Sequence, residues 1–225
     1  MRTYDLADKS VRELNQALHD LPQDANDEIT VLNPNGLHAV ACGIDAPVDV
    51  TIVGHTGYYS AGMHKLGRVI IEGNVGVGVA ENMMSGEVHV KGNASQAAGA
   101  TAHGGLLVID GDASARCGIS LKGADIVVKG SVGHMSCFMA QAGRVVICGD
   151  AGEALGDSLY EVRIYVKGEV KSLGADCIEK DMREEHIIEL QALLERADVE
   201  DDPRNFKRYG SARQLYNFIV DNAVL

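Results

Sequence analysis

The hydrophobic pattern repeats every 19 residues through the middle of the chain. Two apolar columns, two residues apart, recur in seven consecutive units: Val50, Val69, Val88, Leu107, Ile126, Val145 and Ile164 in the first, and Ile52, Ile71, Val90, Ile109, Val128, Ile147 and Val166 in the second. Alternating β-branched residues are typical of a short strand with one buried face. A strict repeat of this length indicates stacked units that bury their apolar faces against one another.

Each unit turns at a glycine two residues after the second column. These structural turn glycines are Gly54, Gly73, Gly92, Gly111, Gly130, Gly149 and Gly168. Small residues extend the pattern to Gly-x-x-Gly-x-x-x-Gly, which is complete in Gly149, Gly152 and Gly156. Columns that admit only small residues predict tight corners and closely stacked backbones.

The repeat predicts an all-β core, a right-handed β-helix of about seven 19-residue turns, with short α-helices at the N- and C-termini. Left-handed hexapeptide helices use multiples of six residues per turn, and 19 is not such a multiple. Alternating charges also favour stacking, because Glu72, Lys91, Asp110 and Lys129 would face one another between rungs. Opposite charges in such positions stabilise a sheet slightly.

Helix signals flank the repeat. Ser10 and Glu13 form a capping box before an amphipathic run that ends at Pro22. Residues 184–197 carry apolar side chains at helical spacing, and Ser211-Ala212-Arg213-Gln214 predicts the start of a last short helix carrying Leu215, Phe218 and Ile219. We expect these helices to cover the open ends of the stack.

The pattern divides the chain into three parts. Residues 1–48 are expected to form the N-terminal helix and an irregular first turn, residues 49–178 the β-helix, and residues 179–225 a C-terminal helical segment.

An outward-facing row of the strands is aliphatic where a solvated rod would be polar. Ile70, Val108, Val127 and Val146 lie between the two inward columns. Such a row predicts a cover, supplied by the C-terminal helix of the chain or by another subunit. Tyr58 and Tyr59 lie in a corner where later units carry small or polar residues. They are candidates for anchoring a partner or for capping the first rung.

Composition narrows the function classes. A net charge of −12 without a basic stripe argues against nucleic-acid binding. The sequence shows neither the long apolar run of a membrane protein nor a secretory signal at its N-terminus. Five cysteines without metal-type spacing indicate reduced, buried thiols in a cytoplasmic protein. Of the eight histidines, the following six are scattered over different columns and suggest no metal site: His38, His55, His64, His89, His103 and His134.

Several stretches together resemble one family. The chain is similar to the GXGXG domain of the glutamate synthase large subunit in its glycine rungs and in two further stretches, Asn33-Pro34-Asn35-Gly36-Leu37-His38 and Gly54-His55-Thr56-Gly57-Tyr58-Tyr59. Formylmethanofuran dehydrogenase also carries this repeat in one of its subunits. The N-terminal stretch to Leu21 and residues 208–222 resemble freestanding members of this family, above all the B subunit of N-methylglutamate synthase.

The resemblance implies a structural subunit without catalytic, cofactor-binding or metal-binding residues of its own. It implies a hetero-oligomer with a class II glutamine amidotransferase-like subunit and an FMN-dependent glutamate synthase-like subunit, and FMN and iron–sulfur centres in a partner. Here Met1 is followed by Arg2, so the N-terminal cysteine of that amidotransferase class is absent.

Three parent functions stay open. The first is N-methylglutamate synthase, which converts methylamine and glutamate to N-methylglutamate and ammonia, described as a methylamine–glutamate N-methyltransferase or as an oxidoreductase. The second is a true glutamate synthase or a related amidotransferase complex. The third is an independent β-helix enzyme acting on carbohydrates, which is disfavoured because the chain lacks catalytic clusters and sugar-stacking aromatics.

Overall fold

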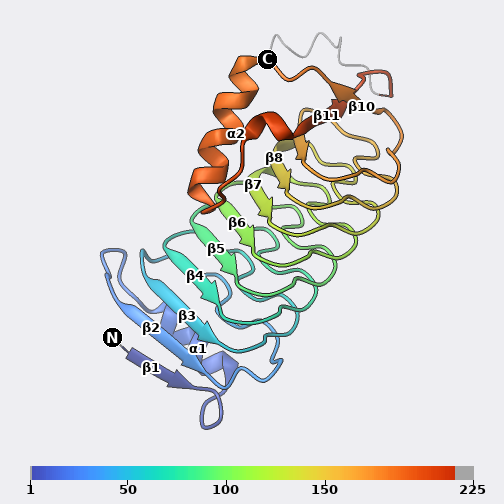
Figure 1. The fold of residues 1–225 in the computed structure, drawn as a ribbon. Coiled ribbons are helices and arrows are strands. Elements are labelled where there is room, and N and C mark those ends of the chain that lie inside the picture. The colour runs from blue at the N-terminus through green and yellow to red at the C-terminus, as the bar shows by residue number, and fades with distance from the viewer. Residues whose placement is uncertain (1, 216–225) are drawn as a thin grey trace, which may run out of the picture.

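One continuous sheet runs the length of the molecule (Figure 1). The computed structural model describes residues 2–215, and in this range eleven strands pair in the order β1-β2-β3-β4-β5-β6-β7-β8-β9-β11-β10. The strands are β1 (Arg2–Asp5), β2 (Glu28–Leu32), β3 (Asp49–Val53), β4 (Arg68–Ile71), β5 (Glu87–Val90), β6 (Leu106–Ile109), β7 (Lys122–Val128), β8 (Ala142–Ile147), β9 (Arg163–Val166), β10 (Cys177–Lys180) and β11 (Lys207–Ser211). The helices are α1 (Val11–His19), α2 (Glu184–Arg196) and the 3-10 helix η1 (Pro203–Asn205).

The 19-residue repeat is the register of a parallel β-solenoid. Strands β3 to β9 pair in parallel, so that Val50 lies beside Val69 and Ile52 beside Ile71, and the same offset continues to Val166. A second ladder of single bridges joins the far side of successive rungs, from Thr56 and Val75 to Val170. The predicted β-helix of about seven turns is confirmed.

The turn glycines are required by the close approach of stacked backbones. A Cβ on Gly130 would lie 2.2 Å from Asp112 Oδ1 and 2.7 Å from the Gly111 carbonyl oxygen. The backbone of Gly130 is outside the left-handed region, so a larger residue is excluded by contact and not by its torsion angle. The same carbonyl oxygen accepts the Gly130 N–H at 3.1 Å.

The corners use left-handed backbone at a different set of positions. Gly118 and Gly156 have φ of 68°, and non-glycine residues such as Ala80 and Cys137 occupy the same column at 55° and 62°. The small-residue preference in the third position of the motif therefore has a conformational cause. The first glycine of the motif is therefore required by close backbone contact, and the third position by a positive φ angle.

A ladder of polar side chains runs beside the turn glycines. Asn74 Oδ1 accepts the Asn93 N–H, and Asn93 Oδ1 accepts the Asp112 N–H, each at 2.8 Å. Asp112, Ser131 and Asp150 continue the same contact in the following rungs. Each side chain satisfies a backbone donor at the corner of the next rung, which ties the turns together where no sheet ladder runs.

Helix α1 closes the interior at the N-terminal end of the solenoid (Figure 1). Ser10 Oγ accepts the Glu13 N–H at 3.2 Å and Glu13 Oε2 accepts the Ser10 N–H at 2.8 Å, which confirms the capping box. Leu14 and Leu18 are buried in the same core as the apolar columns. The helix thus shields the apolar interior of the first rung from water.

The C-terminal end differs from the prediction of a helical cover. Strand β11 pairs antiparallel with β9, and β10 pairs with the outer edge of β11. Ser211 ends β11 and does not begin a helix; Phe218 and Ile219 lie outside the described residues. Strand β1 was not predicted either. These strands extend the sheet at both ends because backbone pairing satisfies the edges of the outer rungs.

The charge ladder forms in part. Lys129 Nζ lies 2.9 Å and Lys91 Nζ 3.4 Å from the carboxylate of Asp110. Burial alone would raise the pKa of Asp110, but hydrogen bonds from His89 and Lys129 lower it below its ordinary value. Asp110 therefore remains ionised between two cationic rungs.

The stacking constraint can be tested at one corner. Gly130→Ala should lower the free energy of unfolding by about 3 kcal/mol, because the new methyl group overlaps the Asp112 side chain and the Gly111 backbone. Ser114→Val, at an exposed position of a neighbouring corner, is the matched control. Denaturant titration measures both; equal stability of Gly130→Ala and the wild type would contradict the close stacking.

Candidate functional site

Helix α2 lies on the outer face of the sheet and covers the aliphatic row. Val108, Val127 and Val146 are at most 1% exposed and pack with Leu190, Leu193 and Leu194 of α2 and with Ala197, the residue that follows it. Of the two covers that the sequence allows, the structure shows the first: the row is covered by the chain's own C-terminal helix. These three valines are therefore unavailable to a partner, whereas Ile70 lies outside this cluster and is half-buried.

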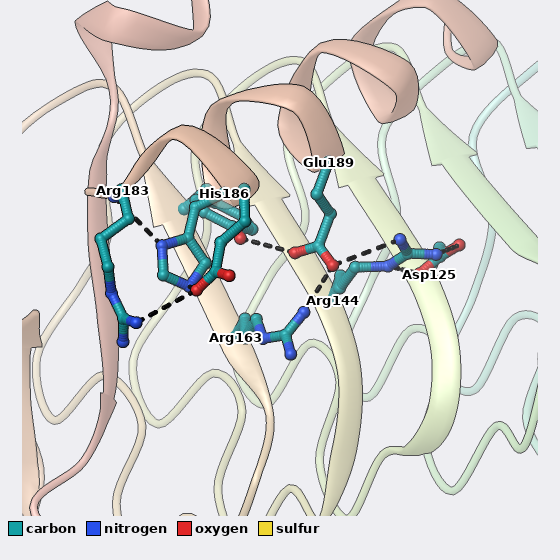
Figure 2. Close-up of polar contacts among 8 residues, drawn as sticks. Asp125, Arg144, Arg163, Arg183, His186 and Glu189 are labelled. Carbon is teal, nitrogen blue, oxygen red and sulfur yellow. Dashed lines mark hydrogen bonds and ion pairs between the residues drawn. The ribbon is translucent and has the colours of Figure 1, made fainter. Parts of the chain in front are cut away.

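A polar seam follows the edge of this helix (Figure 2). Glu189 points from α2 toward Arg144 of β8 and Arg163 of β9, and it forms ion pairs with both. The hydroxyl of Tyr165 donates to Glu189 Oε1 at 2.6 Å. One carboxylate on the helix thus neutralises two guanidinium groups on successive rungs.

Asp125 is the buried end of the seam. Its side chain is 8% exposed, and Arg144 binds it through two hydrogen bonds of 2.7 Å. Arg196 at the end of α2 reaches the same carboxylate at 3.2 Å. The hydrogen bond to Asp125 raises the pKa of Arg144, so the guanidinium remains charged. A bidentate pair of this kind fixes geometry as well as charge.

The contacts of the seam join α2 to the strands beneath it. Burial, followed by the hydrogen bond to Glu189, raises the pKa of Tyr165 above its ordinary value, so its hydroxyl remains protonated. Each carboxylate is held between two arginines as the acceptor of their ion pairs. The arrangement clamps α2 to the sheet.

Helix α2 begins beside the seam (Figure 2). His186 is buried, and its Nδ1 accepts the Arg183 N–H at 3.2 Å, which caps the start of the helix. Burial, and next the nearby Arg208, lower the pKa of His186, so the imidazole is neutral. Neutral His186 fits its role as acceptor of the capping hydrogen bond.

The two candidate tyrosines have different surroundings. Tyr58 is 57% exposed and its ring stacks on His38 with centroids 4.5 Å apart. Tyr59 is half-buried, and its hydroxyl oxygen accepts a hydrogen bond from Asn82 Nδ2 at 3.1 Å. Tyr59 therefore belongs to the corner of the second rung, and Tyr58 remains a candidate contact for a partner.

The structure does not bring the histidines and cysteines together into a site. Within residues 2–215, no group of three His, Cys, Asp or Glu side chains is arranged to hold a metal ion. Burial raises the pKa of Cys117 and of Cys177 to about 12 each, so these thiols are protonated. In the same range, no helix has the length and apolar character needed to cross a membrane.

Sequence reasoning missed the polar seam. Its signal was present, because Asp125, Arg144 and Arg163 occupy one column at 19-residue spacing, and Arg68 and Glu87 of the same column pair at 3.4 Å. The contribution of Glu189 had no periodic signal, since it depends on how α2 lies against the sheet.

The covered row yields a first test. Val127→Lys should lower the melting temperature of the isolated chain strongly, because a buried lysine without a partner costs several kcal/mol. Thr51→Lys, in the same column beyond the apolar cluster under α2, is the matched control and should have a small effect. Melting followed by circular dichroism compares them; a normal melt of Val127→Lys would contradict the cover.

A second test uses pH. His64 is fully buried, its Nε2 lies 3.1 Å from the Gly67 carbonyl oxygen, and its Nδ1 has no partner among the described residues. Burial lowers the pKa of His64 from its ordinary 6.5, so below that pH the unfolded chain takes up a proton that the folded chain excludes. Stability is therefore retained above pH 6.5 and lost as pH falls.

Unfolding free energies at pH 7.5 and 5.5 measure this loss. The wild type should lose about 1 kcal/mol more than His64→Gln over this interval. His103→Gln, at an exposed histidine, should retain the wild-type dependence. Identical pH dependences for all three proteins would show that His64 takes up its proton in the folded state.

Comparison with known proteins identifies one full-length relative. No protein-family model matches the chain. Protein GlxC of Rhizobium meliloti (strain 1021) is 61% identical over 225 residues, which cover 99% of each chain. Identity at this level over both whole chains extends through the solenoid and the helices at its ends, and the protein therefore belongs to the GlxC family.

Proposed function

We propose that this chain is a non-catalytic structural subunit of a glutamate-synthase-type complex, and specifically of an N-methylglutamate synthase. The observation that carries the proposal is the uninterrupted solenoid built on the glycine rungs, which are the feature that resembles the GXGXG family. Every rung is bonded to the next by a strand ladder and a second bridge, so the rod resists bending. Such a rod suits the task of holding two enzymes at a set distance.

The partners in this proposal are a class II glutamine amidotransferase-like subunit and an FMN-dependent glutamate synthase-like subunit with iron–sulfur centres. Two active sites that exchange a reactive amine need defined separation and orientation, because proximity lowers the entropic barrier to transfer. The charged groups of the seam form ion pairs that hold α2 against the sheet, and this supports a structural role. A true glutamate synthase, or a related amidotransferase complex, is the alternative parent enzyme.

Tyr58 is the contact that the proposal assigns to a partner. Its ring is exposed, and the neighbouring Leu37 is 40% exposed, which gives an apolar corner at one end of the rod. Exposed aromatic side chains held in one orientation are typical anchors of protein interfaces. Stacking on His38 provides that orientation before a partner binds.

Affinity purification of the tagged chain from its native cell tests the assembly. We expect two further subunits, one with glutaminase-type chemistry and one that carries FMN, and an isolated chain that is colourless and inactive. A chain that purifies alone and transfers amine or cleaves carbohydrate would contradict the structural role.

The assigned contact is tested by mixing purified subunits. Tyr58→Ala should melt like the wild type and weaken assembly about tenfold or more, as expected for an interface anchor. Met139→Ala removes a comparably exposed side chain from a more distant rung and is the matched control. Size-exclusion of the mixtures measures both; normal assembly of Tyr58→Ala would exclude this corner as a contact.

A further inference from the structure

A positively charged cavity lies where the C-terminal strands meet the start of α2. Its volume is about 430 Å³, and it is bounded by β9, β10, β11 and the first turn of α2. Five cationic side chains and two carboxylates line it, in a chain whose net charge is −12. The cations are Arg163, Lys180, Arg183, Arg208 and Arg213. This concentration of positive charge runs against the overall balance of the protein.

Three of these cations have carboxylate partners. Arg163 pairs with Glu189 of the seam, and Nη2 of Arg213 donates to both carboxylate oxygens of Glu161 at 2.7 Å. Arg183 lies 3.3 Å from the exposed Glu185. Both carboxylates that line the cavity are therefore already engaged, and neither is left to neutralise another cation.

Lys180 and Arg208 are the two cations that remain. They are directly opposite each other on the paired strands β10 and β11, so their side chains share one face of the sheet. Among residues 2–215, neither has a carboxylate oxygen within 4 Å, and Arg208 donates only its Nε–H, to the Asp181 carbonyl oxygen at 3.0 Å. Like charges directly opposite in an antiparallel pair destabilise the sheet unless something neutralises them.

The excess positive charge affects the pKa values of two groups at the cavity wall. Burial lowers the pKa of Arg208, and repulsion from Arg183 and Arg163 lowers it further, against the opposite effects of Tyr165 and Asp181. His186, which also lines the cavity, is kept neutral by burial and by the same arginines. Groups at the cavity wall thus experience a positive potential that an anion would relieve.

We propose that this cavity is a binding site for a small dianion bearing carboxylate or phosphate groups, with Lys180 and Arg208 as its principal ligands. A planar guanidinium binds a carboxylate or phosphate through two parallel hydrogen bonds, and an ammonium adds a point charge. The volume suits a small metabolite. Because charged and polar residues make up most of the wall, a flavin or another large aromatic ring does not fit its chemistry.

The site stands independently of the structural role proposed above. It depends on the strand pair β10–β11 and on α2, which belong to the chain alone. Binding is therefore measured on the isolated chain, and its failure would leave the assembly proposal unaffected.

The test is thermal unfolding of the full chain in inorganic phosphate and in succinate, against sodium chloride at equal ionic strength. We expect each dianion to raise the melting temperature in a saturable way. Lys180→Gln and Arg208→Gln should each weaken the apparent affinity about tenfold or more. Lys122→Gln, at an exposed lysine on β7 away from the cavity, should bind like the wild type.

The unliganded proteins add a readout that a purely structural role would not give. Without dianion, Lys180→Gln should unfold at no lower temperature than the wild type, because it removes the repulsion from Arg208. In saturating phosphate the order should reverse. Equal shifts in the wild type and in Lys180→Gln/Arg208→Gln, or shifts no larger than those in chloride, would overturn the proposal.

The chain carries a carboxylate of its own beyond the described residues, at Asp221. Asp221→Asn separates this source from a free ligand. If the wild type binds phosphate and Asp221→Asn binds it with equal affinity, the ligand is a free dianion, as proposed. If only Asp221→Asn responds to phosphate, the chain itself neutralises the cavity and the proposal is wrong.

Discussion

The close parallel stacking of 19-residue turns is the constraint on which the rest of this structure depends. Each strand bonds to the next, and the turn glycines allow backbones to approach where a Cβ would overlap the rung before, as at Gly130. Once this spacing is set, every chemical choice repeats along the rod. Apolar columns fill the interior, and polar columns such as Asn74 and Asn93 bond from rung to rung.

The stacked sheet also creates two problems that the ends of the chain resolve. An open apolar interior is closed by α1, whose Leu14 and Leu18 enter the core. The outer valine row would be a broad exposed apolar strip, and α2 covers it. Ion pairs from Glu189 and Arg196 then fix α2 at one register against the strands. The solenoid is therefore complete as a single chain along most of its length.

These features bear on how the protein works with others. Ion pairs within the chain and the cover over the valine row remove part of the surface from contact with partners. The two surface features to which we assign contacts lie at opposite ends of the rod. One is the corner with Tyr58, and the other is the cationic cavity beside α2. A rigid spacer with a distinct feature at each end is consistent with the structural role that we propose.

The sequence by itself determined the parts that repeat. The inward columns, the turn glycines, the number of turns and the α1 capping box follow from local periodicity and local hydrogen bonding, which a linear pattern records. Only the tertiary structure decided which partner covered the valine row, because α2 is separated from Val127 by more than fifty residues. It also decided that residues 207–211 form a strand, since the edge of β9 outweighs the local helix signal at Ser211. The seam through Glu189 and the pairing of Lys180 with Arg208 likewise arise only when distant segments meet, where no local period exists to predict them.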